Sequence, residues 1–487
     1  MKKLTAIASC VLLTSMLVTA CGSGGDIKEP ASNNVSSSTA ATSETNTSGG
    51  DTAAAGETEA KQEPVTITVQ GQKPDKKEAI EQLNLKIDRF KSANPYVTIK
   101  TDDWEYNPNE IGIKMAANNA PTEFTSYLTE GRTLAERSWA ADLTTLINNW
   151  THKDDLNPIM TKPVTVDGKI YGVPVDAYVM TITLNKKIFE EKGVPLPPLD
   201  WTWDDLIDAA KKVNDPAKGI AGFIPMGKGN EAGWNWTNFL YAAGGDVQTI
   251  ADGKVTAAFN SEAGLKALQL YQSLKDADVL PKNWALGYGD ALNLFNQGRG
   301  AMVMCGSGNA ADAAINTGGI SKDDIIVYPI PSMTKGGKHT GVLGGSFKVI
   351  NPKASEQEQK TAFDWITSEY YTDDFVNAID SEITTRKNEN KIYVPQTIFY
   401  WKPESEFGKK FTDMLAKHDN VFTYDPALLS LLEGKPEAEY EAQQTYAEIS
   451  TIVQKVFTTK NLDLQKVLND AASKIQSEVY DKIQIKQ

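Results

Sequence analysis

Aromatic side chains interleaved with polar ones are the part of this sequence best suited to chemistry. The chain of 487 residues has ten tryptophans, and Trp234 and Trp236 lie in a stretch that also contains Gly233 and Asn235. An indole ring stacks on the apolar C–H face of a sugar, while carboxylates and amides bind the hydroxyl groups at its edge. The pattern predicts a cleft for a hydroxylated ligand, with the alternative that both tryptophans are core residues.

The residue types that usually carry catalysis form no known motif. His152, His339 and His418 are far apart in the sequence and lack the spacing of metal ligands. The sequence has no Gly-x-Ser-x-Gly turn, no phosphate-binding loop and no EF-hand calcium loop. A glycosidase needs only two carboxylates in fixed geometry, and the acids are numerous enough to leave that alternative open. We expect a binding protein with no catalytic residues, no metal and no cofactor.

The elements that would position these side chains are clearest between residues 169 and 213. A Tyr171–Pro174 turn precedes an apolar, β-branched run from Val179 to Leu184, which is long enough for one buried strand. Three prolines between 195 and 198 then hold an extended connection, because proline cannot continue a helix. This order predicts a turn, a strand and an extended segment in succession.

Thr202 can cap the helix that follows, with Asp205 three residues later in a capping-box arrangement. Its apolar face is formed by Leu206, Ala209, Ala210 and Val213. At the other end of the chain, Val65, Ile67 and Val69 alternate as in a half-buried strand, followed by helical spacing and a second alternating segment. The sequence therefore predicts a β-α-β opening and a parallel sheet.

The ordered set between 169 and 213 resembles the family 1 extracellular solute-binding proteins, the maltose-binding-protein-like group. A second signature is similar to that of the family: Phe295, Gly298 and Ala301-Met302 follow its Phe-x-x-Gly-x-x-Ala-Met order. Where maltose-binding members have Gly-x-Trp, this chain has Gly306-Ser307-Gly308, so one stacking platform of that group is missing. The resemblance implies an α/β, two-lobed periplasmic-binding-protein-like fold of type II, with open sheets flanked by helices and a ligand cleft between the lobes.

The resemblance also implies the placement of a ligand site and of the lobes. Asp176 follows the turn where the family crosses between lobes, and Tyr288 precedes Phe295 by the family's seven residues. The expected ligand-binding residues are Gln70, Trp104, Ser126, Asp176, Tyr178, Trp234, Trp236, Tyr288, Ser307, Asn309, Gly345 and Ser346. The expected organisation is a signal peptide (1–20), a lipidated cysteine with a disordered linker (21–63), an N-terminal lobe (64–176 plus 331–390) and a C-terminal lobe (177–330 plus 391–487).

The beginning of the chain predicts export and anchoring. Lys2 and Lys3 precede an apolar run, and Val18-Thr19-Ala20-Cys21 resembles a bacterial lipobox, with lipidation expected at Cys21. Residues 22–63 are rich in Gly, Ser, Thr and Ala and lack apolar periodicity, so we expect a flexible tether. The alternative is an ordinary secretory signal. Cys305 is then the only unmodified cysteine of the mature chain, and we expect it to be a small buried residue.

The net charge and the family resemblance together limit the partners expected for this chain. The net charge of −14 disfavours nucleic acid and anionic lipid as partners. The resemblance implies the extracellular receptor of an ABC importer, anchored by lipid to the bacterial cell membrane. Its expected partners are a carbohydrate, with an oligosaccharide as the expected class, and the transmembrane permease subunits, and we expect a monomer. The alternatives are a surface-anchored polysaccharide hydrolase and a sensory or adhesive lipoprotein for a non-sugar solute.

Overall fold

The computed structural model of the chain describes residues 63–108, 110–306 and 308–485. The expected signal peptide, Cys21, most of the linker and Ser307 lie outside the described residues. Residues 65–487 form one compact unit. Within the described part of the chain, no helix is both long and apolar enough to cross a membrane.

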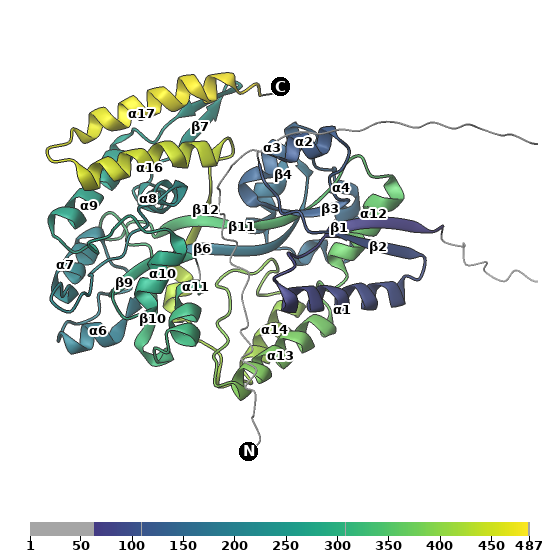
Figure 1. Cartoon of the computed structure of the whole chain (residues 1–487), viewed down its shortest axis with the longest axis horizontal. Helices are drawn as coiled ribbons and strands as arrows, with labels where there is room; N and C mark the ends of the chain where they lie inside the picture. Colours follow the sequence, from purple (N-terminus) through teal and green to yellow (C-terminus); the bar gives the residue numbers. More distant parts are fainter. Residues whose placement is uncertain (1–62, 109, 307, 486–487) are drawn as a thin grey trace, which may run out of the picture. The chain divides into compact units, whose positions relative to one another are not determined.

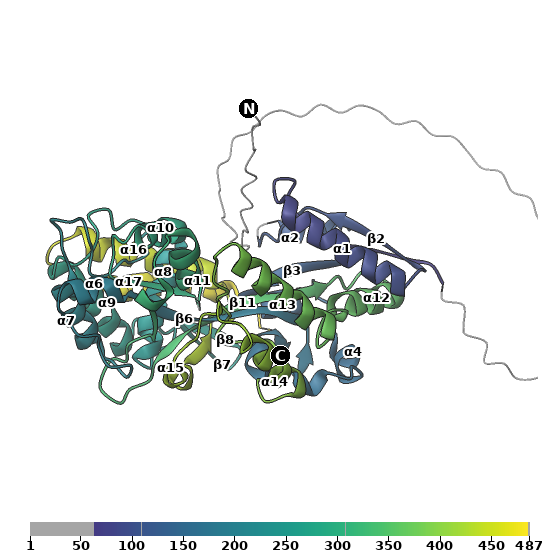
Figure 2. The same cartoon turned by 90° about the horizontal axis from the view of Figure 1, so that it is seen from below.

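The predicted β-α-β opening is confirmed. β1 (Val65–Gln70) and β2 (Val97–Asp102) are parallel and joined by α1 (Lys77–Ala93). Every second residue of β1 is buried, as the alternation of valine and isoleucine predicts. α1 and α12 (Glu356–Thr367) lie beside β1 and β2 (Figure 2). The rings of Phe90 in α1 and Trp365 in α12 meet edge to face.

Two long antiparallel strands, β6 (Val173–Asn185) and β11 (Thr340–Ile350), connect the two halves of the largest sheet. Its other strands are β3 (Glu123–Tyr127), β9 (Met302–Gly306), β10 (Ile325–Pro329) and β12 (Glu433–Pro436). The main order is β10-β6-β11-β3-β1-β2, with β9 also paired to β6 and β12 to β11. In Figure 1, β6 and β11 run side by side between the helices of the two halves. The strand predicted over Val179–Leu184 is therefore the second half of a longer strand that begins within the Tyr171–Pro174 turn.

The buried side chains of β6 and β11 belong to different cores along their length. Val179 and Leu343 pack in a cluster of buried residues beside β3, and we call this cluster, together with the neighbouring one around β1, α1 and α12, the first core. Met180 and Val342 pack in another, the second core. On β6 the two cores overlap between Ala177 and Met180, because Tyr178 already packs against the second core and neighbouring strand residues face opposite sides of the sheet. On β11 the change occurs between Val342 and Leu343, 12 residues beyond the expected boundary at 330/331.

Helices surround the second core. α7 (Trp203–Val213) begins with the predicted capping box of Thr202 and Asp205. Trp201 and Trp203 are buried, and their indole N–H groups donate to carbonyl oxygens of Pro329 and Pro331. The other helices whose apolar faces contribute to this core are α6 (Lys186–Glu191), α8 (Asn230–Ala242), α9 (Glu262–Asp276), α16 (Ala442–Thr458) and α17 (Leu464–Glu478).

The segment after residue 370 packs differently from the grouping expected from the sequence. α13 (Asp373–Asn388) and α14 (Glu406–Leu415) form an aromatic core of their own, in which Trp401 is 3% exposed. The backbone N–H of Asn157 donates to the carbonyl of Tyr400 at 2.8 Å, and Trp150 packs on both this core and the first core. Residues 399–414 thus pack beside the first core, whereas the sequence grouped 391–487 with the other lobe.

The remaining elements are shorter. Those before β6 are α2 (Ile111–Ala116), α3 (Gly131–Glu136), α4 (Thr144–Asn148), α5 (Pro158–Thr161), β4 (Thr165–Val166) and β5 (Lys169–Ile170). Those after it are β7 (Gln248–Ala251), β8 (Lys254–Ala257), α10 (Tyr288–Asn296), α11 (Asn309–Asp312), a π-helical turn (Ala313–Thr317) and α15 (Pro426–Leu431).

Candidate functional site

The candidate site begins where β6 and β11 pair near the change of core. Tyr178 lies opposite Gly344, and Asp176 lies opposite Ser346, with a register shift just after Ser346. A Cβ at Gly344 would lie 2.3 Å from atoms of the Tyr178 ring. Gly345 has φ of 152°, and a Cβ there would lie 2.1 Å from the Asp176 carbonyl oxygen. Glycine is therefore required at both positions for the two strands to approach around Tyr178.

Three half-buried aromatic rings from separate elements meet at this point. Trp234 of α8 contacts Tyr178 of β6 edge to face, with ring centroids 6.3 Å apart. On its other side, Trp234 lies 6.4 Å from Tyr288, the first residue of α10, at an angle of 45°. Gly233 lets α8 approach α16 closely, because a Cβ there would lie 2.3 Å from the Tyr446 carbonyl oxygen. Close helix packing thus fixes Trp234 between the two tyrosines.

The hydroxyl of Tyr288 is held from two sides. It lies 2.8 Å from the Cys305 sulfur and accepts a hydrogen bond from the Asn309 amide at 3.1 Å. The backbone N–H of Tyr288 donates to Glu231 at 2.7 Å. Cys305 is buried as expected, and burial raises the pKa of its thiol to about 11. The thiol is therefore protonated at neutral pH and serves as a hydrogen-bonding partner rather than as a nucleophile.

Asp176 combines exposure with desolvation. The residue is exposed to solvent, yet desolvation by the surrounding protein raises the pKa of its carboxyl, although the backbone N–H of Ala177 acts in the opposite direction. This combination is typical of a side chain at a recessed surface. Ser346, on the adjacent strand, is half-buried, so a carboxylate and a hydroxyl lie close together here.

Two acids that the sequence reasoning missed belong to the same neighbourhood. Glu437, just after β12, accepts a hydrogen bond from Tyr446 at 2.8 Å, and burial raises its pKa to about 7. Glu130 accepts from the buried Tyr106 at 2.8 Å, and burial raises its pKa as well. The charge of Glu130 acts on Glu437, and the charges of Glu437 and Asp176 both act on Tyr178. No local motif surrounds Glu437; only the pairing of β12 with β11 reveals its place.

Several expected site residues instead support the first core. The side-chain oxygen of Gln70 accepts from the backbone N–H of Thr125 at 2.6 Å, which joins β1 to β3. Trp104 is 9% exposed, donates to Glu110 at 3.0 Å and packs on Phe124. Ser126 is buried within β3. These three side chains are engaged in packing or in the sheet rather than gathered with Tyr178.

Trp236 was also expected at the ligand site, and the structure places it elsewhere. It is completely buried in the second core, and Gly264 of α9 lies close to its ring. Of the two alternatives for this residue, the structure favours the core residue. The structure thus brings together Asp176, Tyr178, Trp234, Tyr288, Asn309, Gly345 and Ser346, and it leaves Gln70, Trp104, Ser126 and Trp236 outside that group.

Comparison with known proteins shows the family to which this chain belongs. Residues 86–386, more than half of the chain, match the family of bacterial extracellular solute-binding proteins, and the chain belongs to this family. A binding protein of Brucella abortus is 31% identical over 144 residues, which are 29% of this chain and 34% of that protein. The match thus spans about a third of the relative's length.

Solved structures show the same fold over nearly the whole body. A solute-binding protein of Thermotoga lettingae with bound α-D-tagatose has a TM-score of 0.62 at 22% identity, covering 85% of this chain and 99% of that one. A cyclic α-maltosyl-1,6-maltose binding protein of Arthrobacter globiformis has a TM-score of 0.63 at 19% identity, covering 86% and 100%. The predicted two-lobed α/β fold and the family resemblance are both confirmed, and these relatives are binding proteins.

Proposed function

We propose that this chain binds a neutral carbohydrate between two lobes that meet along β6 and β11. The observation that carries the proposal is the group of Tyr178, Trp234 and Tyr288, three half-buried rings beside the exposed carboxyl of Asp176. Aromatic faces suit the C–H face of a sugar, and a carboxylate accepts hydrogen bonds from its hydroxyl groups. An oligosaccharide is the ligand class that the separate rings suit best.

The charge of the site favours a neutral ligand over an anion. The charges of Asp176 and Glu437 act on Tyr178, and that of Glu130 acts on Glu437; the whole chain carries a net charge of −14. An anionic ligand would be repelled by these carboxylates in a partly desolvated site. Neutral hydroxyl groups, in contrast, could donate to them without a charge penalty.

The lobes themselves are part of the proposal. The expected division places 64–176 with 331–390 and 177–330 with 391–487. The cores support a refined division within 177–180 on β6 and at 342/343 on β11, with residues 399–414 beside the first lobe. Ligand contacts with both lobes would favour a closed form, and closure is what an ABC permease could recognise.

A binding screen tests the proposal. We would titrate the purified full-length chain with D-tagatose, maltose, D-mannitol and maltotriose, following the melting temperature and the heat of binding. At 100 times the dissociation constant, a bound sugar should stabilise the fold by roughly 2.7 kcal/mol. The recovered sugar should be chemically unchanged, because we propose a receptor; hydrolysis would favour the surface-hydrolase alternative. Absence of binding to every neutral sugar would refute the proposal.

Anchoring is a further part of the proposed function. The lipobox-like Val18–Cys21 supports a lipid-anchored protein on the extracellular face of the bacterial cell membrane, acting as a monomer with the permease subunits. Cys21→Ser should shift the protein from the membrane fraction into the medium, as measured by immunoblotting of both fractions. Cys305→Ser is the matched control and should leave the distribution unchanged. Retention of the Cys21→Ser variant in the membrane would contradict lipidation.

A further inference from the structure

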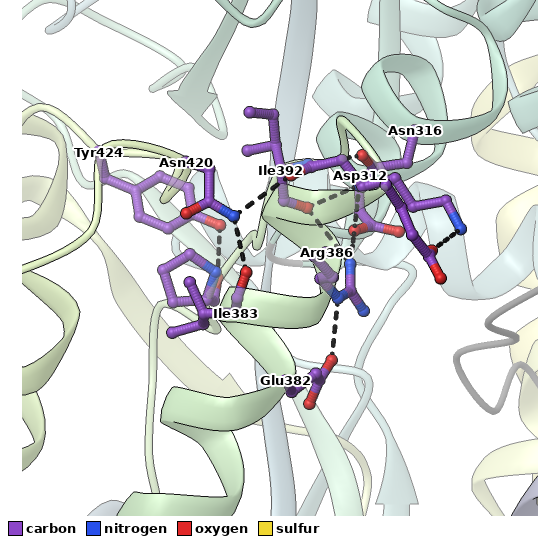
Figure 3. Close-up of polar contacts among 11 residues, drawn as sticks. Asp312, Asn316, Glu382, Ile383, Arg386, Ile392, Asn420 and Tyr424 are labelled. Atoms are coloured by element: carbon purple, nitrogen blue, oxygen red, sulfur yellow. Dashed lines mark hydrogen bonds and ion pairs between the residues drawn. The ribbon is translucent and has the colours of Figure 1, made fainter.

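Arg386 is a buried cation that links α13 to the helix carrying Asn309. Its side chain is 6% exposed, and its partner Asp312 of α11 is 19% exposed. One terminal nitrogen of Arg386 donates to Asp312 at 3.2 Å and to the Ile392 carbonyl at 3.2 Å, while Nε donates to Glu382 at 2.9 Å (Figure 3). A guanidinium with three acceptors at fixed angles orients all of them, which a lysine could not do.

Two of the three acceptors, Asp312 and the Ile392 carbonyl, belong to segments outside α13 that are also bonded to each other's neighbourhood through Asn316. Asn316, one turn after Asp312, donates to Asp312 at 2.9 Å and to the Ile392 carbonyl at 2.8 Å, and it accepts from the Ile392 N–H at 2.9 Å. Figure 3 shows Asp312, Asn316 and Ile392 around the Arg386 guanidinium. The segment 392–395, which we call the strap, is thereby fixed to the α11 region at its first residue.

The strap then lies against the turn that precedes Asn309. A Cβ at Gly308 would lie 2.4 Å from a methyl carbon of Val394 and 2.3 Å from the Tyr424 hydroxyl. That hydroxyl donates to the Pro395 carbonyl at 2.7 Å, so the far end of the strap is fixed as well. Strap and turn are packed so closely that one cannot shift without the other.

The short helix α11 connects Arg386 to the ring of Tyr288. Asn309, its first residue, donates to the Tyr288 hydroxyl, and Asp312, three residues later, accepts from Arg386. The Asp312 N–H also donates to the Gly308 carbonyl at 2.8 Å. A displacement of Asp312 is therefore transmitted to Asn309 within one helical turn, and from there to the ring of Tyr288.

We infer that Arg386 is a positioning residue for the ligand site: it holds Asp312 and the strap so that Asn309 keeps Tyr288 in place beside Trp234. Arg386 itself touches none of the three aromatic rings of the site in the contacts of the described residues. The inference rests on the proposed function for its consequence on binding, whereas its structural part is independent of any ligand.

The test compares Arg386→Met, Arg386→Lys and the control Lys192→Met in the full-length chain. Lys192 likewise pairs with a largely buried acid, Asp215, at 2.7 Å, but the partners of that pair are Lys218 and Ile220, away from the strap. Hydrogen exchange followed by mass spectrometry should show faster exchange over 308–317 in Arg386→Met, an intermediate rate in Arg386→Lys and the wild-type rate in Lys192→Met. Asn316→Ala should speed exchange over the same residues while keeping the Arg386–Asp312 pair.

The binding measurement uses the same variants with D-tagatose, maltose and D-mannitol in a calorimeter. Arg386→Met should weaken whichever sugar the wild type binds by roughly 2- to 10-fold, the lower part of the range for residues that act at a distance and no more than loss of the Tyr288 hydroxyl itself, and Lys192→Met should not. Unchanged exchange over 308–317, or faster exchange with unchanged affinity, would overturn the inference. If the wild type binds none of the sugars, the proposed function fails, and the graded exchange result decides the positioning role by itself.

Discussion

The candidate site has an aromatic side and an acidic side, and they are held in place in different ways. On the aromatic side, Trp234 is held by the packing of α8, and the Tyr288 hydroxyl is occupied by Cys305 and Asn309. On the acidic side, Glu130 and Glu437 each have a tyrosine hydroxyl as partner, and desolvation raises both pKa values. The aromatic side should thus be rigid and indifferent to pH, and the acidic side should respond to pH.

The largest effect is expected from the residue that supports the aromatic side from behind. Trp236→Ala removes a completely buried indole from the second core. The loss in the free energy of unfolding should be roughly 3–5 kcal/mol, measured by chemical denaturation. Sugar affinity per folded molecule should change little. A stable Trp236→Ala protein with weakened binding would instead return Trp236 to the ligand site.

Trp234→Ala should reduce sugar affinity more than stability, which is the reverse of the result expected for Trp236→Ala. Its half-buried ring contacts two tyrosines of the site and packs only at the margin of the buried cores. Loss of stacking should weaken sugar binding by about 1–3 kcal/mol, or roughly 5- to 150-fold, in calorimetric titration. The melting temperature without ligand should fall much less than in Trp236→Ala, because the Trp234 ring is only half-buried. Equal losses of stability in Trp234→Ala and Trp236→Ala would remove the distinction between the two sides of α8.

These two tryptophans also show what sequence reasoning could reach. Residues at positions i and i+2 of an α-helix are separated by roughly 200° around its axis. Trp234 and Trp236 therefore point to nearly opposite sides of α8. Helical periodicity over residues 230–242 would have assigned one of them to the core, but the Gly- and Asn-rich composition hid that periodicity. Local signals such as the capping box at Thr202 were predictable because they involve neighbouring residues.

The parts that could not be predicted depend on distant contacts. Glu437 reaches the site because β12 pairs with β11, across more than 90 residues of sequence. The Tyr288–Cys305 contact joins a helix start to a buried strand. The packing of residues 399–414 on α13 follows from aromatic contacts without any periodic motif. Family resemblance predicted Asp176 and Tyr288 as site residues. The roles of Glu437 and Cys305 depend on strand pairing and could be identified only from the structure.

On the acidic side, Glu437 should make stability depend on pH. Its folded pKa of about 7 is above the ordinary value of 4.5, so between these values the folded state holds a proton that the unfolded state has released. The free energy of unfolding should therefore fall as pH rises from 4.5 to 7 and stay level above it. Because the residue is only half-buried, the effect should be on the order of 1–2 kcal/mol after solvent screening.

Glu437→Gln should flatten this part of the pH profile. Urea denaturation of wild type and variant between pH 4.5 and 8 gives the difference directly, and other titrating groups cancel. The charged and titratable groups around Glu437 are Glu130, Tyr178, Tyr241 and Tyr446. Glu404→Gln, at an exposed acid, is the control and should follow the wild-type profile. Identical profiles for wild type and Glu437→Gln would show that the acidic side is not tuned by burial.

The smallest effect should come from Tyr288→Phe on the aromatic side. The Tyr288 hydroxyl already contacts the Cys305 sulfur and accepts from Asn309, so the ring face rather than the hydroxyl is what the site offers to a sugar. Removing the oxygen should cost less than about 1.5 kcal/mol in affinity, since only one net hydrogen bond is involved. Tyr288→Ala, which removes the ring, should cost more than Tyr288→Phe in the same calorimetric titration. If Tyr288→Phe weakened binding as strongly as Tyr288→Ala, the hydroxyl would have to bind the sugar directly, and the aromatic side would not be the stacking surface that its geometry indicates.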